Sequence, residues 1–463
     1  MNKVNENFIV KSAIWYTVGT FLLKGINFFT IPIFVRILSP GDYGVTAIYA
    51  TWNGIFSVFI GLGINGTIGS AKANLQDEDY EEYLTSTLFL GTISFFIVLF
   101  IGIIFKDILV KLMGMNFGIL IILIIHSFFS FVINFMCAKY TFEKDYKMYL
   151  KVSFIVTIIN VLVSILLTIL ISNNKYIGKI YGGAIATSIV GIILYIKIIS
   201  KSKQLINIKH WKFCLPMAIP LIFHGLSSMI LNQADRVMLQ KITNDLTVGV
   251  YSFTYNIGII LNIVNMAVNS SWVAWYFEAM KEKKIKEISK NAKVYIIVFT
   301  TITGMFIMGS PEVIKFLGPR EYWSGIGLLP IIILGYYFVF LYTFSVNYEF
   351  YMKKTNYIAI GTLVAACVNI AVNMILIPVI GMYGAAIATL VAYIILFIMH
   401  EIIVRKIFKH NDFKFSYYIY SIIAICCVTF VFYILINAFI IRWSLIVLSV
   451  LVIGIYSYKK YIK

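Results

Sequence analysis

Polar side chains recur at helical spacing inside apolar stretches of this sequence, and the first of these stretches carries a lysine. Lys24 and Asn27 follow Thr17 and Thr20 at intervals of three and four residues, which places all four on one helical face. A cation at the centre of a membrane helix costs about 2.5–3.5 kcal/mol on insertion scales. We therefore expect Lys24 to line a cavity that attracts an anion, to be held in an internal ion pair, or to extend its ammonium to the membrane surface as a snorkelling lysine.

A second polar stretch repeats every four residues and ends in an acid–base pair. It runs through His224, Ser228, Asn232 and Arg236, with Asp235 beside the last. Neighbouring residues do not share a helical face, so Asp235 is expected to reach another helix. Two interpretations of Asp235 stay open, a structural lock near the outer boundary of the membrane or a contact to substrate or coupling ion. His224 alone is more typical of a hydrogen-bonded interior histidine than of a proton carrier.

The longest polar stripe carries three asparagines and two tyrosines. Tyr251, Tyr255, Asn262, Asn265 and Asn269 fall on one helical face. Asparagines hold membrane helices together, each contributing roughly 1 kcal/mol or less. Three asparagines with tyrosines also suit a hydroxyl-rich ligand such as a sugar. The spacing does not decide between helix association and cavity lining.

The elements that must position these residues are membrane-spanning helices. Of 463 residues, 60% are hydrophobic and only 13% charged, too few charges to cover a soluble protein of this size. Apolar runs recur at the roughly 20-residue length that crosses a bilayer. We predict an all-α polytopic membrane protein with about fourteen spans, at 9–35, 44–68, 84–105, 117–138, 150–172, 181–199, 213–238, 247–271, 292–314, 325–347, 357–380, 383–404, 416–438 and 443–458.

The charge pattern orients these spans. Lysines and arginines gather in alternate loops, which places both termini in the cytoplasm by the positive-inside rule. The net charge of +18 therefore indicates contact with anionic lipids rather than with nucleic acid. The richest basic segment, Lys281–Lys293, is expected to form a surface helix on the inner leaflet. None of the five cysteines forms a CxxC pair, so we expect no disulfide framework and no metal site.

Internal repetition divides the spans into two halves. Tyr181–Ile196 and Tyr383–Ile398 are identical at ten of sixteen positions. A weaker match pairs Leu38–Ala50 with Thr243–Tyr255 at a similar offset. Gly44 of the first segment is aligned with Gly249 of the second. We predict a six-helix lobe at 1–200, a second at 201–410 and a helix pair at 411–463. Six spans per lobe make the repeats parallel, with an axis along the membrane normal and a substrate site between the halves.

The chain is not expected to be an enzyme and needs no cofactor. The stretch Gly61–Gly66 matches GxGxxG but ends an apolar helix with no preceding strand, so a dinucleotide site is rejected. No HExxH, GxSxG or P-loop motif occurs. The external loops are short and leave no room for a catalytic domain outside the membrane.

Two signatures resemble a family of flippases. Arg36–Tyr49 (RILSPGDYGVTAIY) and Asn232–Gly258 (NQADRVMLQKITNDLTVGVYSFTYNIG), together with a YGAAIAT element, are similar to polysaccharide exporters of the multidrug/oligosaccharidyl-lipid/polysaccharide superfamily over about 1–406. The resemblance implies transfer of undecaprenyl-pyrophosphate-linked oligosaccharide from the inner to the outer leaflet of the bacterial cytoplasmic membrane. It also implies a cationic cavity in which Lys24, Arg236 and Arg36 contact the headgroup, and a polymerase or glycosyltransferases as partners.

The last two spans set this chain apart from many twelve-span oligosaccharide flippases. In having them, the chain resembles the lipid II and sporulation-related branches of the superfamily, in which terminal helices help to accommodate the lipid tail. A lipid II-type flippase is therefore one alternative. A cation-coupled multidrug exporter is another, with Asp235 as its best carboxylate. A glycan polymerase or ligase is disfavoured by the short external loops. The leading mechanism is alternating access by rocking of the two halves.

Overall fold

The computed structural model describes residues 19, 25–26, 28–201 and 204–461, with side chains to Leu451, and this part of the chain is helical without strands. Twelve of its helices are long and apolar enough to cross a membrane. Two shorter apolar helices, Phe28–Ile37 and Phe439–Leu451, fall where the first and last spans are expected. The prediction of an all-helical, multi-pass membrane protein is confirmed. Most of the first expected span, with Lys24 and Asn27, lies outside the described residues.

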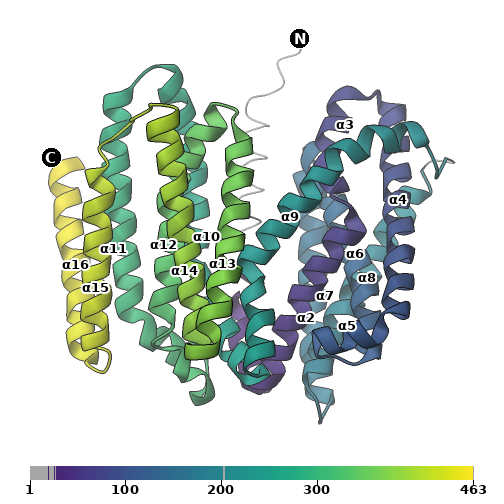
Figure 1. The fold of residues 1–463 in the computed structure, drawn as a ribbon, viewed down its shortest axis with the longest axis horizontal. Coiled ribbons are helices and arrows are strands. Elements are labelled where there is room, and N and C mark those ends of the chain that lie inside the picture. The colour runs from purple at the N-terminus through teal and green to yellow at the C-terminus, as the bar shows by residue number, and fades with distance from the viewer. Residues whose placement is uncertain (1–18, 20–24, 27, 202–203, 462–463) are drawn as a thin grey trace. The chain divides into compact units, whose positions relative to one another are not determined.

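The chain divides into two compact units, Met1–Gly249 and Val250–Lys463. Unit 1 contains the helices from purple to teal in Figure 1. They are α2 (Pro40–Gly61), α3 (Ile68–Asn74), α4 (Asp77–Ile104), α5 (Lys106–Met113), α6 (Phe117–Phe142), α7 (Tyr146–Leu170), α8 (Tyr176–Ile199) and α9 (Ile208–Ile242), with a short 3-10 turn at Ile64–Thr67.

Unit 2 begins within α10 (Asp245–Lys281) and ends with the last helix pair. Its other elements are α11 (Ile285–Leu317), a 3-10 turn at Arg320–Gly325, α12 (Leu329–Tyr351), α13 (Thr355–Ile380), α14 (Met382–Ile402) with a π-helical turn at Ile403–Ile407, α15 (Ser416–Ile434) and α16 (Phe439–Tyr461). Helix α12 is the most deeply buried of the candidate spans, with 78% of its apolar window inside the protein. Helices α15 and α16 both pack on α11, beside which they lie in Figure 1.

Local sequence explains where α2 begins and ends. The Ser39 side chain accepts a hydrogen bond from the Asp42 backbone N–H, and Pro40 occupies the first turn, where its missing N–H costs nothing. Leu62 and Gly63 then take positive φ angles of 49° and 71°. The predicted span at 44–68 extends past this break, because it is based on apolar length and hydropathy does not depend on the backbone conformation.

Glycines let neighbouring helices approach closely at corresponding places in the two units. A Cβ on Gly182 of α8 would clash with Ser164 of α7. A Cβ on Gly384 of α14 would clash with the backbone of Leu376 and Ile377 in α13. Gly182 and Gly384 occupy the same position in the repeated sequence. The equivalent glycine therefore packs against the preceding helix in both pairs, although it meets a different part of that helix in each.

Large apolar side chains cover the outside of both units. Phe96 and Phe100 on α4 are 60% and 66% exposed, and Leu166 and Leu170 on α7 are 58% and 67% exposed. Such surfaces are stable in lipid and not in water.

The expected surface helix at Lys281–Lys293 is not a separate element. Helix α10 ends at Lys281, Lys283 takes a positive φ of 59°, and α11 then runs without interruption from Ile285 to Leu317. The basic stretch is thus a turn followed by the first part of a spanning helix. Its amphipathic pattern arises because Ile288 and Ala292 are buried against the unit while the lysines are exposed.

Candidate functional site

The buried arginine of α9 is held by its own helix. Arg236 is 4% exposed and its Nη1 donates to the Asn232 carbonyl oxygen at 2.9 Å. The carboxylate of Asp235 lies 3.6 Å from the same Nη1 and also accepts the Arg236 backbone N–H at 2.8 Å. The neighbouring acid and base thus meet as an ion pair, and a contact of Asp235 with another helix stays a prediction.

Contacts to α2 fix this part of α9. Thr51 donates to the Gln233 side-chain oxygen at 3.3 Å. A Cβ on Gly54 would clash with Met229, so the two helices approach closely one turn further along. These contacts hold the α9 segment that carries Asn232 and Arg236 against α2.

Two further predicted site residues of unit 1, Arg36 and His224, are exposed. Arg36 is exposed, and its guanidinium donates to the Pro32 carbonyl oxygen at 2.9 Å. His224 is exposed on the apolar surface of α9, so it is not the interior histidine that its pattern suggested.

The polar stripe of α10 contributes one clear helix-to-helix bond in unit 2. Asn269 accepts a hydrogen bond from the Asn347 side chain of α12 at 2.9 Å, so this asparagine joins helices. Tyr255 is buried against Tyr336, with ring centroids 5.7 Å apart. Asn265 is also buried and Asn262 half-buried.

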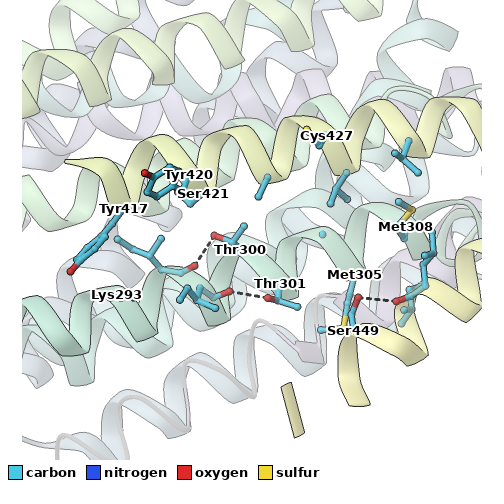
Figure 2. A pocket seen from close by; sticks show the side chains of 18 residues that line it. Lys293, Thr300, Thr301, Met305, Met308, Tyr417, Tyr420, Ser421, Cys427 and Ser449 are labelled. Carbon is cyan, nitrogen blue, oxygen red and sulfur yellow. Dashed lines mark hydrogen bonds between the residues drawn. The ribbon is translucent and has the colours of Figure 1, made fainter. Parts of the chain in front are cut away.

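An apolar cavity that the sequence did not predict lies among α11, α15 and α16 (Figure 2). Its volume is about 590 Å³, and its α11 wall runs from Lys293 to Met308, about 22 Å at 1.5 Å per residue. Figure 2 shows side chains of α11 and α15 facing each other along it, from Lys293 and Tyr417 at one end to Met308 at the other.

The threonine and serine hydroxyls that line this cavity are bonded to the walls themselves. Thr300 and Thr301 donate to carbonyl oxygens one turn earlier on α11, at 2.6 and 2.9 Å. Ser421 and Ser449 do the same on α15 and α16. The surface offered to a ligand is therefore apolar along its length. Lys293 is the one charged residue among the described lining residues.

A buried ion pair fastens the last helix to the wall of this cavity. Arg442 of α16 is 1% exposed and bonds both carboxylate oxygens of Glu312 on α11, at 2.6 and 2.8 Å. It also donates to the Met308 carbonyl oxygen at 2.5 Å. This two-pronged geometry is the strongest form of side-chain ion pairing.

Sequence reading also missed a half-buried lysine in unit 1. The Lys179 ammonium lies 4.6 and 4.4 Å from the ring centres of Phe34 and Tyr43, and it donates to the Thr46 hydroxyl at 3.3 Å. The cation is thus held by aromatic faces. A lysine inside the predicted sixth span region was the available signal, but its aromatic partners lie far away in the sequence.

The two segments of the weaker sequence match, Leu38–Ala50 and Thr243–Tyr255, contact each other in the structure. A Cβ on Gly44 would clash with the Asp245 carbonyl oxygen, and a Cβ on Gly249 would clash with the Pro40 carbonyl oxygen. Gly44 corresponds to Gly249 in the match, and Pro40 to Asp245. The glycine of each segment therefore packs against the backbone at the start of the other segment. Such a reciprocal contact is the pattern that a two-fold axis generates.

Comparisons with known proteins place the chain in a family. Residues 9–280 match the model of the family described as "Polysaccharide biosynthesis protein". A Haemophilus influenzae protein named "Lsg locus putative protein 1" is 22% identical over 388 residues, which cover 78% of this chain and 90% of that protein. An uncharacterized membrane protein of the same organism is 22% identical over 83% of this chain and 92% of its own length.

Solved structures share the fold. A structure of the lipid II flippase MurJ in an inward closed conformation matches with a TM-score of 0.77 at 16% identity, covering 97% of this chain and all of that one. An inward-facing multidrug resistance MATE family transporter of the MOP superfamily matches with a TM-score of 0.63 at 13% identity, over 84% of this chain and 96% of that one. The chain belongs to the polysaccharide biosynthesis protein family, and its fold is similar to that of the two transporters.

Proposed function

We propose that this protein is a flippase that moves undecaprenyl-pyrophosphate-linked oligosaccharide, a polysaccharide repeat unit, from the inner to the outer leaflet of the bacterial cytoplasmic membrane. The apolar cavity of unit 2 is the observation that carries the proposal. A transporter of small cations has no need of a 22 Å apolar trough, whereas a lipid-linked substrate must place its hydrocarbon tail somewhere during transfer.

The tail fits the cavity by chemistry. Polyprenyl chains offer only hydrocarbon, and the lining threonine and serine hydroxyls are already bonded to their own helices, so these groups stay paired when a tail enters. Lys293 at one end supplies a positive charge near the level of the lipid headgroups. The last helix pair, which forms one wall, thus serves to hold the tail.

The headgroup needs cations within the protein. Arg236 is buried and locally fixed, and Lys24 is the corresponding cation expected from the sequence of the first span. The pyrophosphate would offset the cost of placing these cations in the membrane. Asn27, Asn232 and the asparagine–tyrosine stripe of α10 are proposed to meet sugar hydroxyls.

Alternating access by two parallel six-helix lobes is the proposed mechanism. The reciprocal contact of Gly44 and Gly249 and the equivalent glycine packing of α8 and α14 support the repeat. Fourteen crossings, with both termini on the same side, follow if Phe28–Ile37 and Phe439–Leu451 belong to full spans, and the basic loops favour the cytoplasmic side.

A deletion strain tests this proposal. Loss of the gene should cause lipid-linked repeat units to accumulate on the inner leaflet, measured by labelling glycan in right-side-out and inverted vesicles. Wild-type protein should restore export, and so should Ile423→Trp, which adds bulk outside the cavity. Ala424→Trp, which fills the cavity from the next residue of α15, should not.

The opposite location of the glycan would overturn the proposal. If unpolymerised repeat units in the deletion strain already lie on the outer leaflet, the protein acts after translocation, as a polymerase or ligase would. Normal export with folded Ala424→Trp would remove the tail-binding role of the cavity.

A lipid II-type substrate is the second candidate, favoured by the match to MurJ over 97% of this chain. Depletion would then cause lipid II rather than polysaccharide units to accumulate on the inner leaflet. A cation-coupled drug exporter is less well supported, because the carboxylate best placed for coupling, Asp235, already lies 3.6 Å from Arg236.

A further inference from the structure

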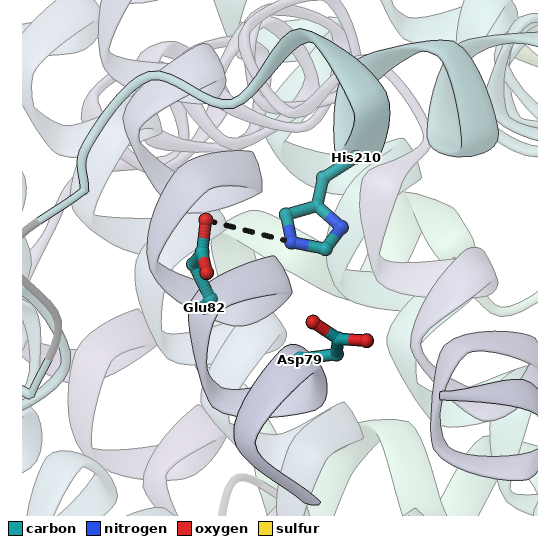
Figure 3. Close-up of side chains that lie close together, drawn as sticks. All are labelled: Asp79, Glu82 and His210. Atoms are coloured by element: carbon teal, nitrogen blue, oxygen red, sulfur yellow. Dashed lines mark ion pairs between the residues drawn. The ribbon is translucent and has the colours of Figure 1, made fainter. Parts of the chain in front are cut away.

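Three side chains of metal-binding type gather at the beginnings of α4 and α9 in unit 1 (Figure 3). Asp79 and Glu82 are three residues apart and share one face of α4. His210 is in the first turn of α9. One ligand atom from each residue lies within 4.8 Å of the other two.

The buried imidazole points to a missing ligand. His210 is 2% exposed, and its Nε2 has no hydrogen-bond partner among the described residues. The Nε2 atom lies 3.8 Å from Glu82 Oε1, too far for a hydrogen bond, and Figure 3 shows the ring beside both carboxylates. Buried polar atoms in folded proteins nearly always have a partner.

Helix capping does not account for both carboxylates. Acidic residues suit the first turn of a helix, which explains Asp77, Glu78 and Asp79. Asp77 in addition pairs with Lys72 at 2.8 Å. Glu82, however, lies in the second turn. Among the residues that the structure describes, no lysine or arginine is within ion-pair distance of Glu82 or Asp79.

We propose that Asp79, Glu82 and His210 bind a divalent transition-metal ion such as Zn²⁺ or Mn²⁺. One imidazole nitrogen and two carboxylates suit these ions better than Mg²⁺ or Ca²⁺, which prefer oxygen ligands alone. Metal–ligand distances of about 2.0–2.2 Å require the three donors to draw together. Asp79 is partly exposed, so water can complete the coordination.

Surrounding hydrogen bonds already hold two of the ligands in place. The Asn207 side chain donates to Glu82 Oε1 at 2.5 Å and accepts the backbone N–H of His210 at 3.4 Å. The Asn207 backbone N–H in turn donates to the Ser86 hydroxyl at 3.0 Å. Such outer contacts orient ligands in metal sites and raise metal affinity.

The bound ion would pin the beginning of α9 to α4. The segment between α8 and α9 ends at Asn207, so the site closes this connection at its α9 end. Because α9 carries Arg236, the metal would also limit movement of the helix that holds this cation. The site is independent of the substrate proposed above and stands if that substrate is wrong.

Metal binding by the purified full-length protein tests the inference. The protein is prepared in detergent with a tag that contains no histidine, stripped with chelator, and dialysed against Zn²⁺ or Mn²⁺. Elemental analysis should find one ion per chain in the wild type and in Glu78→Gln, an exposed carboxylate of the same turn. Dissociation constants should rise at least tenfold in Asp79→Asn, Glu82→Gln and His210→Gln. The same metal should raise the melting temperature of the wild type but not of these variants.

Equal metal uptake by the wild type and the folded Asp79→Asn and Glu82→Gln variants would overturn the site. Binding of Mg²⁺ as tight as that of Zn²⁺ would also contradict it, because an acidic patch without the imidazole would suffice. If His210→Gln does not fold, Asp79→Asn decides the matter, since its side chain lies at the partly exposed edge.

Discussion

Removal of the buried arginine of α16 should loosen the last helix pair. Arg442 makes two bonds to Glu312 and one to the Met308 carbonyl oxygen. Breaking a fully buried ion pair by removing one partner costs about 3–5 kcal/mol. The Glu312 side chain is 23% exposed, so water recovers part of this loss. We expect Arg442→Met to cost about 2–3 kcal/mol.

The assay is thermal unfolding in detergent. For a unit of roughly 200 residues, this loss corresponds to a fall in melting temperature of about 5–10 °C. Arg320→Met is the matched control, because Arg320 is exposed and its guanidinium lies 5.6 Å from the centre of the Trp323 ring. Its cost should be about 1 kcal/mol or less.

A double substitution separates the ion pair from side-chain size. Arg442→Met combined with Glu312→Met removes the carboxylate left without its partner, so the double variant should be more stable than Arg442→Met alone. If the two single effects simply add, the ion pair is not coupled and the reasoning is refuted.

Other predictions concern the proposed transport path. Lys24→Ala should abolish glycan export without loss of folded protein, and unchanged export would contradict a cationic cavity. Arg236→Lys should fold normally, whereas Arg236→Gln combined with Asp235→Asn should fold but lose export, as measured by surface glycan. Gly44→Ala should destabilise the protein by about 1–3 kcal/mol because a Cβ meets backbone, while Gly41→Ala, with open space, should not. An inside-negative potential should speed outward transfer of the anion, by up to about 2.3 kcal/mol per charge per 100 mV, and no response in vesicles would exclude this driving force.

The spanning helices could be predicted because length and hydropathy act locally. The predicted span at 117–138 lies within α6, Phe117–Phe142, and that at 357–380 within α13, Thr355–Ile380. The ends were less predictable where the backbone turns within an apolar run, as at Leu62 and Gly63.

The sites depend on contacts between distant residues and were mostly invisible in the sequence. The Arg442–Glu312 pair joins residues 130 apart, and the apolar cavity exists only when α15 and α16 pack on α11. His210 and Glu82 are also distant in the sequence and lie close together only in the folded chain. The Gly44 and Gly249 match was visible as repetition, but nothing in it indicated that the two glycines contact each other's segments.

Transfer of lipid-linked glycan by the purified protein tests the central claim most directly. Proteoliposomes containing the full chain receive polyprenyl-pyrophosphate-linked oligosaccharide in one leaflet, and a membrane-impermeant glycosidase reports its arrival in the other. We predict rapid transfer by the wild type and by Ile423→Trp, and loss of transfer by Ala424→Trp for long-chain carriers only. Transfer no faster than in protein-free vesicles, with protein shown to be folded, would contradict the account.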